Sequence, residues 1–148
     1  MTRALIPEFN RVILELAPRH EARSFAPSTL AELRACDAER PSGGLIVWSG
    51  ESTRTIYGDA RVNFAFRAWH DAEHVRGGHA FNLTGERATA DAQARAVLAA
   101  YPRAPRAWLA LLDAEINGQA EHFARFGAFP LDQVAFVRGA LAEHVTWN

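Results

Sequence analysis

The strongest constraint on the fold is a succession of four helical patterns after residue 58, each with its own start and stop signals. The starting residues are Asp59, Thr84, Pro105 and Pro130, and the ending residues are Gly77-Gly78, Pro102 and Gly127. Short polar side chains cap a first helical turn, proline fits that turn, and glycine adopts the left-handed conformation that ends a helix. The predicted helices cover about 60–76, 85–101, 105–126 and 130–143. Because the loops between them are short, they predict a four-helix bundle over about 60–145.

Residues 1–58 predict a smaller α/β flank on that bundle. Ser28 can cap a helix through about Glu39. The runs Leu45–Trp48 and Thr53–Tyr57 enclose a polar turn, and two short strands around a turn predict a β-hairpin. The sequence therefore predicts a mainly α fold. It forms a single domain over 1–148, with an N-terminal flank at 1–58 and a helical bundle at 59–148.

The amino-acid composition and net charge limit the classes of function that the chain can have. Hydrophobic residues make up 49% of the 148 residues and charged residues 22%, which is ordinary for a globular domain. The net charge is -1 and the chain has no lysine and no basic run, so nucleic-acid binding is not indicated. No apolar stretch reaches the length of a membrane span, so we expect a cytoplasmic protein without a membrane partner. The single Cys36 excludes an intramolecular disulfide and a cysteine-based zinc site.

The first of the four helices carries His70 and His74, which are four residues apart and therefore share one face. Two imidazoles at this spacing can bind one metal ion. Asp71 beside them can join as a ligand or fix the tautomer of an imidazole. Asn63 and Arg67 lie along the same edge, where Arg67 is placed to bind an anion. The alternative is a solvated helix face with two ordinary histidines.

The third helix places polar groups where an apolar stripe is expected. The stripe consists of Trp108, Leu111, Leu112, Phe123 and Phe126. Glu115, Gln119 and His122 fall in the middle of it. A buried carboxylate without a partner is costly, so an arginine, a hydrogen-bond network or a metal ion must compensate Glu115.

The second helix has an inward glutamate as well. Glu86 shares an otherwise mostly apolar side with Ala90, Gln93 and Val97. Two inward glutamates and a histidine pair on three neighbouring helices together favour a metal site. The predicted ligands are His70, His74, Glu86 and Glu115. Mixed nitrogen and oxygen ligands admit a divalent zinc, manganese or iron ion.

The string Trp69-His70-Asp71-Ala72-Glu73-His74 resembles the His-Asp-x-x-His core of HD-domain metal-dependent phosphohydrolases. The resemblance covers six of the 148 residues. It implies an all-helical fold in which His70 and Asp71 bind a divalent metal. The family also uses an upstream histidine and a downstream aspartate, for which the chain offers His20 and either Asp113 or Asp132.

The predicted site is also similar in style to that of ferritin-like carboxylate proteins, which hold two metals with glutamates and Glu-x-x-His pairs from four helices. That motif is missing here, since Glu115 and His122 are seven residues apart. The run from Phe66 to Asp71, with Glu86 and Glu115 further on, resembles small uncharacterised proteins of phages and plasmids. This last resemblance implies no activity.

Together these patterns favour a small metal-dependent hydrolase that acts on a phosphate ester or nucleotide, a small anionic substrate, through a metal-bound water. Asp71 would bind the metal or orient a histidine ligand. His122 would be a further metal ligand or the general base. Arg67 would stabilise the negative charge that develops during hydrolysis. Two alternatives stay open. One is a non-enzymatic interaction protein of phage or mobile-element type with a structural metal or polar network. The other is a di-iron carboxylate redox protein. A homo-oligomer is compatible with all three.

Overall fold

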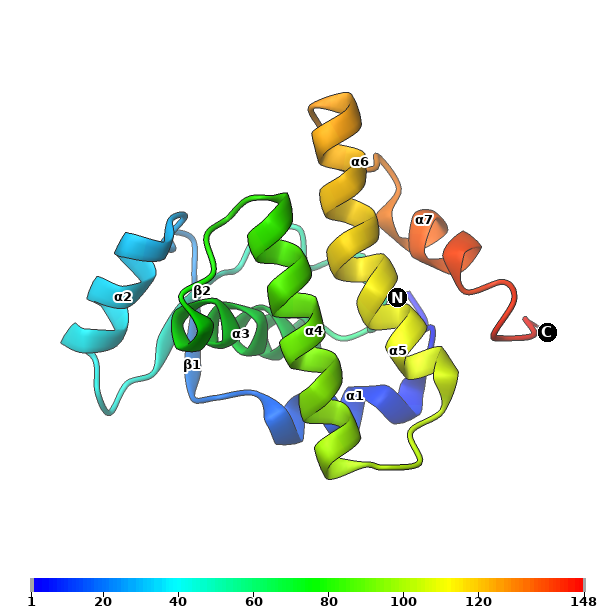
Figure 1. Cartoon of the computed structure of the whole chain (residues 1–148), viewed down its shortest axis with the longest axis horizontal. Coiled ribbons are helices and arrows are strands. Elements are labelled where there is room, and N and C mark those ends of the chain that lie inside the picture. The colour runs from blue at the N-terminus through cyan, green and yellow to red at the C-terminus, as the bar shows by residue number, and fades with distance from the viewer. Residues whose placement is uncertain (1, 148) are drawn as a thin grey trace. The chain divides into compact units, whose positions relative to one another are not determined.

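The computed structural model describes residues 2–147 and is mainly helical, as predicted (Figure 1). Its elements in chain order are α1 (Pro7–Leu16), β1 (His20–Arg23), α2 (Leu30–Glu39), β2 (Leu45–Trp48), α3 (Ala60–Gly77), α4 (Leu83–Ala100), α5 (Arg106–Asp113), the π-helical turn η1 (Ala114–Gly118), α6 (Gln119–Phe126) and α7 (Gln133–Ala140). None of the helices in this described part is long and apolar enough to cross a membrane. The chain divides into two compact units, Met1–Phe81 and Asn82–Asn148.

The predicted helices form, with caps one or two residues from those expected. The side chains that accept the capping hydrogen bonds are Thr29 for α2 and Asn82 for α4, in place of Ser28 and Thr84. Asp132 caps α7, whose predicted start was Pro130. Asp59 caps α3 as predicted. Hydrogen bonds from the side chain and backbone of Arg61 hold the pKa of Asp59 below its usual value, so this cap stays ionised at neutral pH.

Helix α3 is the central element of the first unit, where it packs against α1, α2, β1 and β2. Its apolar face buries Val62, Ala65, Phe66 and Trp69, and α1 buries Phe9, Val12 and Ile13. Each such large apolar side chain stabilises the fold by about 1.5–3 kcal/mol when it is fully buried. The helix ends where Gly78 adopts the left-handed conformation, and the chain then turns back toward the helix.

The sheet of the first unit differs from the predicted hairpin. Strand β2 forms at the predicted place, but it pairs in parallel with β1, in a register from His20 opposite Leu45 to Arg23 opposite Trp48. Residues 53–57 form turns instead of a second strand. After β2 the chain bends, with Glu51 at a φ of 51°, and β2 takes β1 as its partner instead of the segment that follows it. Helix α2 supplies the crossover that two parallel strands need.

In the second unit, α4 packs against α5, η1 and α6, and α7 packs against α5 and η1. The helix predicted over 105–126 forms as α5, η1 and α6 in direct succession. Trp108, Leu111 and Leu112 are buried as predicted, but Phe123 and Phe126 are 48% and 62% exposed. The prediction was wrong for these two phenylalanines. A π turn holds one residue more than an α turn, so the residues after η1 are rotated by about 100°.

A substitution of Gly44, the residue immediately before β2, tests the parallel pairing of β1 and β2. Its φ is +75°, and a Cβ there would lie 1.9 Å from the carbonyl oxygen of Arg19, which accepts a hydrogen bond from the backbone N–H of Leu45. Gly78 has a φ of +66°, but the nearest atom to its Cβ would belong to the flexible side chain of Arg34. We expect Gly78→Ala to cost about 1–2 kcal/mol of unfolding free energy through left-handed strain alone. Gly44→Ala should cost at least about 1 kcal/mol more, because the Arg19–Leu45 bond is lost as well.

Urea denaturation of both variants measures this difference. Equal losses of unfolding free energy in the two variants would contradict the close approach of the strands at Gly44.

Candidate metal centre

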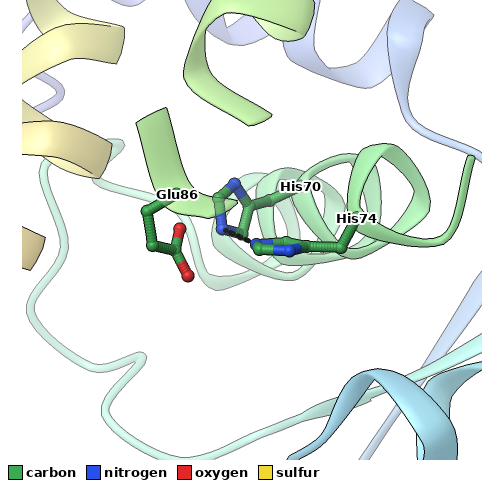
Figure 2. A group of neighbouring side chains, drawn as sticks. All are labelled: His70, His74 and Glu86. Carbon is green, nitrogen blue, oxygen red and sulfur yellow. Dashed lines mark hydrogen bonds between the residues drawn. The ribbon is translucent and has the colours of Figure 1, made fainter. Parts of the chain in front are cut away.

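His70 and His74 face each other on α3, as their spacing predicted. Their Nε2 atoms lie 3.1 Å apart, and the two rings meet edge to face with centroids 4.7 Å apart (Figure 2). The pair belongs entirely to the first unit, on a helix that is held from several sides.

His74 is fully buried and is oriented by the chain that follows α3. Its Nδ1 lies 2.8 Å from the carbonyl oxygen of His79, and its own carbonyl accepts a hydrogen bond from the backbone N–H of His79. A carbonyl can only accept, so Nδ1 carries the hydrogen and the Nε2 of the neutral ring keeps its lone pair. The ring of Phe81 packs on His74 with centroids 4.4 Å apart. The lone pair of His74 is therefore aimed at His70.

His70 is half-buried and stacks on Phe66, with ring centroids 6.1 Å apart and an angle of 13° between the planes. Two arrangements fit the 3.1 Å between the imidazoles. Either Nε2–H of His70 donates to Nε2 of His74, or both lone pairs point at one cation. With metal–nitrogen bonds of about 2.0–2.1 Å, two ligand nitrogens stand about 2.9 Å apart at a right angle and about 3.4 Å apart at a tetrahedral angle. The observed separation lies between these values.

Glu86 joins the histidines from the first turn of α4. One ligand atom from each of His70, His74 and Glu86 lies within 4.8 Å of the other two (Figure 2). The connection between α3 and α4 is short and covers residues 78–82, the last of which caps α4. One helical turn then leads to Glu86, a rise of about 5.4 Å. The structure thus brings together three of the four predicted ligands.

The fourth predicted ligand, Glu115, is not a member of this group. It lies in η1, half-buried, and its carboxylate accepts a hydrogen bond of 2.8 Å from Gln119. His122 also lies in the second unit, where its Nδ1 is 2.8 Å from the carbonyl oxygen of Ala128. Asp71 is half-buried beside His70 on α3, and its role stays a prediction.

Arg67 binds the loop that follows β2, within the first unit. Its Nη1 donates to the carbonyl oxygens of Trp48 and Gly50, the latter at 2.7 Å, and its guanidinium lies 5.3 Å from the centre of the Trp48 ring. One turn earlier on the same face of α3, the side chain of Asn63 donates to Ser52 at 2.9 Å. These contacts give Arg67 a structural role. Its role in stabilising an anion stays a prediction.

Sequence reasoning missed two features of this region. The carbonyl of His79 orients His74, but a backbone acceptor leaves no trace in residue types. Glu73 is 6% exposed and pairs with Arg76 at 2.6 Å. Its place on the apolar side of α3 was the signal that this carboxylate is buried.

Comparison with known protein families, with characterised proteins and with solved structures gives no match for this chain. The resemblance to HD-domain phosphohydrolases therefore stays a prediction.

The hydrogen bonds of Arg67 predict a loss of stability on substitution. Arg67→Ala should lower the free energy of unfolding by about 1.5–3 kcal/mol, the range for hydrogen bonds to a charged group. Arg67→Lys should recover only part of this, because an ammonium lacks the planar fork of a guanidinium. Urea denaturation and amide hydrogen exchange at residues 49–52 provide the measurements.

Arg11→Ala is the matched control, because Arg11 is an exposed α1 residue whose ion pair with Glu15 is 3.6 Å long. It should change stability by at most about 1 kcal/mol. If Arg67→Ala behaves like Arg11→Ala, the contacts with the loop contribute nothing and the assignment fails.

Proposed function

We propose that this protein is a metal-dependent hydrolase in which His70, His74 and Glu86 hold a divalent ion. The observation that carries the proposal is the pair of Nε2 atoms 3.1 Å apart, with the tautomer of His74 set by the carbonyl of His79. A hydrogen-bonded Nδ1 that leaves Nε2 for the ion is the usual state of a ligating histidine.

The composition of the group supports a catalytic ion over a structural one. Structural zinc sites are closed by four protein ligands, whereas catalytic sites use three and keep a position for water or substrate. Two histidines and one glutamate are such a catalytic set, and they suit zinc, manganese or iron. When bound, a divalent ion lowers the pKa of water and polarises a phosphoryl oxygen, which is the chemistry of ester hydrolysis.

The burial of the three residues supports access from one side. His74 is fully buried, whereas His70 and Glu86 are half-buried. A substrate would therefore approach past His70 and Glu86. Asp71, next to His70, would bind the metal or orient a histidine ligand. We propose a small phosphate ester or nucleotide as the substrate, with Arg67 on the same face of α3 to offset its negative charge. His122 stays a proposed base or further ligand.

A second candidate rests on the same distance. A hydrogen bond from Nε2–H of His70 to Nε2 of His74 also accounts for 3.1 Å between the rings. In that case the polar group is structural, and the protein fits the non-enzymatic alternative. Metal binding separates the two candidates directly.

Metal binding is tested on protein purified without a metal-affinity tag. Elemental analysis and calorimetric titration with zinc, manganese and iron(II) should show binding by the unaltered chain. His74→Ala and Glu86→Gln should each lose most of it. An ion at 100 times its dissociation constant should stabilise the native chain by about 2.7 kcal/mol, measured as a chelator-sensitive rise in melting temperature. Iron with visible colour would favour the di-iron redox alternative.

His144→Ala is the control, since His144 is exposed and lies outside the group. It should bind metal as the unaltered chain does. Absence of binding in the unaltered chain, or full binding in His74→Ala, would leave the hydrogen-bonded histidine pair as the better account.

Hydrolysis is tested separately with a phosphomonoester, a phosphodiester and nucleoside triphosphates. Turnover should require the metal, disappear with chelator and fall by several orders of magnitude in His74→Ala. A chain that binds metal tightly but hydrolyses none of these esters would reject the hydrolase and favour a structural or redox metal.

A further inference from the structure

A cavity of about 430 Å³ lies within the first unit, on the side of α3 away from the histidine pair. From α3 it is lined by Ala72, Val75 and Arg76. These residues are three and four positions apart, so they share one face of the helix. His70 and His74 lie two positions before and after Ala72, which is about 200° around the helix. The cavity is therefore separate from the candidate metal centre.

The rest of the wall comes from α2, the start of the strand pair and the loops that lead into it. Its apolar part consists largely of Pro18, Leu45, Ala72 and Val75. Leu45 is 3% exposed, so this apolar wall is continuous with the core of the unit. Pockets for small molecules typically enclose about 300–1,000 Å³, with mostly apolar walls and a few polar groups that orient the ligand. The cavity fits this description in size and in lining.

Three charged side chains line the same cavity from three different segments. Arg19 belongs to the loop before β1, Asp37 to α2 and Arg76 to α3. A guanidinium group binds a carboxylate through two parallel hydrogen bonds, and a carboxylate accepts hydrogen bonds from an ammonium group. The cavity thus presents partners for both charges of a zwitterion beside an apolar wall.

Arg76 is oriented by a buried partner. Its Nη1 lies 2.6 Å from Oε1 of Glu73, whose side chain is 7% exposed, whereas the side chain of Arg76 is 72% exposed. A guanidinium group carries five N–H donors, and this contact uses one of its nitrogens. Its other donors are therefore available to a ligand in the cavity.

Arg19 combines a fixed backbone with an exposed side chain. Its carbonyl accepts a hydrogen bond of 3.0 Å from the backbone N–H of Leu45. The carbonyl of Pro18 lies 2.8 Å from Nδ1 of His20, so the peptide groups on both sides of Arg19 are held. Within residues 2–147, no hydrogen bond or ion pair involves its guanidinium group. A ligand carboxylate can therefore bind Arg19 without breaking an existing ion pair.

The charges around the cavity balance one another. Glu73 offsets Arg76, and Asp37 provides one negative charge for the one positive charge of Arg19. A simple anion would be repelled by Asp37, and a simple cation would be repelled by the guanidinium groups. A neutral ligand with one group of each sign fits this distribution better than either.

We propose that this cavity binds a free α-amino acid with an aliphatic side chain. Its carboxylate binds the guanidinium groups of Arg19 and Arg76, and its ammonium group binds Asp37. Its side chain packs on the apolar wall. The proposal goes beyond the proposed hydrolase and does not depend on it, because none of the three metal ligands lines the cavity.

The test measures binding of L-leucine to the full chain by calorimetric titration, beside three probes that each lack one of its groups. Glycine lacks the side chain, 4-methylpentanoate lacks the ammonium group and 3-methylbutylamine lacks the carboxylate. Leucine should bind at least about tenfold more tightly than each probe, which corresponds to about 1.4 kcal/mol for each missing contact.

Two variants assign the charged groups. Arg19→Gln removes a guanidinium group, so it should weaken the binding of both leucine and 4-methylpentanoate about 10–100-fold. Asp37→Asn removes the partner of the ammonium group. It should weaken leucine binding by a similar factor and leave 4-methylpentanoate bound at least as tightly as before. The two variants are therefore distinguished by the probe that lacks the ammonium group.

Arg11→Gln and Asp91→Asn are the matched controls. They make the same changes of charge at exposed residues that do not line the cavity. Both should bind leucine as the unaltered chain does. All four variants should keep the melting temperature of the unaltered chain within a few degrees, because each substituted side chain is exposed.

Several results would overturn the proposal. One is an unaltered chain that binds no leucine, or that binds it no better than the three probes. Another is an equal loss of leucine and 4-methylpentanoate binding in Asp37→Asn, which would remove the role of Asp37. Inorganic phosphate that displaces leucine as well as 4-methylpentanoate does would reveal a general anion site instead. None of these measurements involves a metal, so the proposed metal centre stands or falls separately.

Discussion

A buried imidazole must have its N–H satisfied, and the carbonyl oxygen of His79 does this for His74. The contact exists because Gly78 takes a left-handed conformation after α3 and sends the chain back along the helix. That return also places Phe81 on the ring of His74 and leaves Asn82 in position to cap α4. The orientation of the histidine pair and the start of the next helix therefore depend on one local backbone reversal.

Helix α3 carries polar side chains along a second face, and loops of the first unit satisfy them. Asn63 and Arg67 contact the segment after β2, whereas His74 contacts the segment after α3. Along α3, His70 lies between Arg67 and His74, and its side chain is half-buried. This arrangement explains why a polar stripe on a central helix is compatible with folding, and it leaves His70 half-buried beside the fully buried His74.

Signals that act within a few residues were readable in the sequence. The Asp59 cap, the end of α3 at Gly77-Gly78 and the facing of His70 and His74 all follow from local spacing, and each formed as predicted. The partner of β2 was not readable, because strand pairing is decided by contacts between residues that are distant in the sequence. The π turn escaped prediction since a regular 100° period was assumed through residue 118, and this placed Phe123 and Phe126 in the core. Of the four predicted ligands, the three that form a group lie on α3 and α4, which are consecutive helices in the chain.

The turn η1 affects which substitutions and deletions the segment from α5 to α6 can accept. Because it holds one residue more than an α turn, the segments before and after it follow the same helical period in different phase. Residues of α5 and α6 that a continuous pattern would place on one face belong to different faces. Substitutions in α5 and α6 are then constrained by separate sets of neighbours. Loss of a single residue within the turn would bring both segments into one phase and turn every side chain beyond it toward a different neighbour.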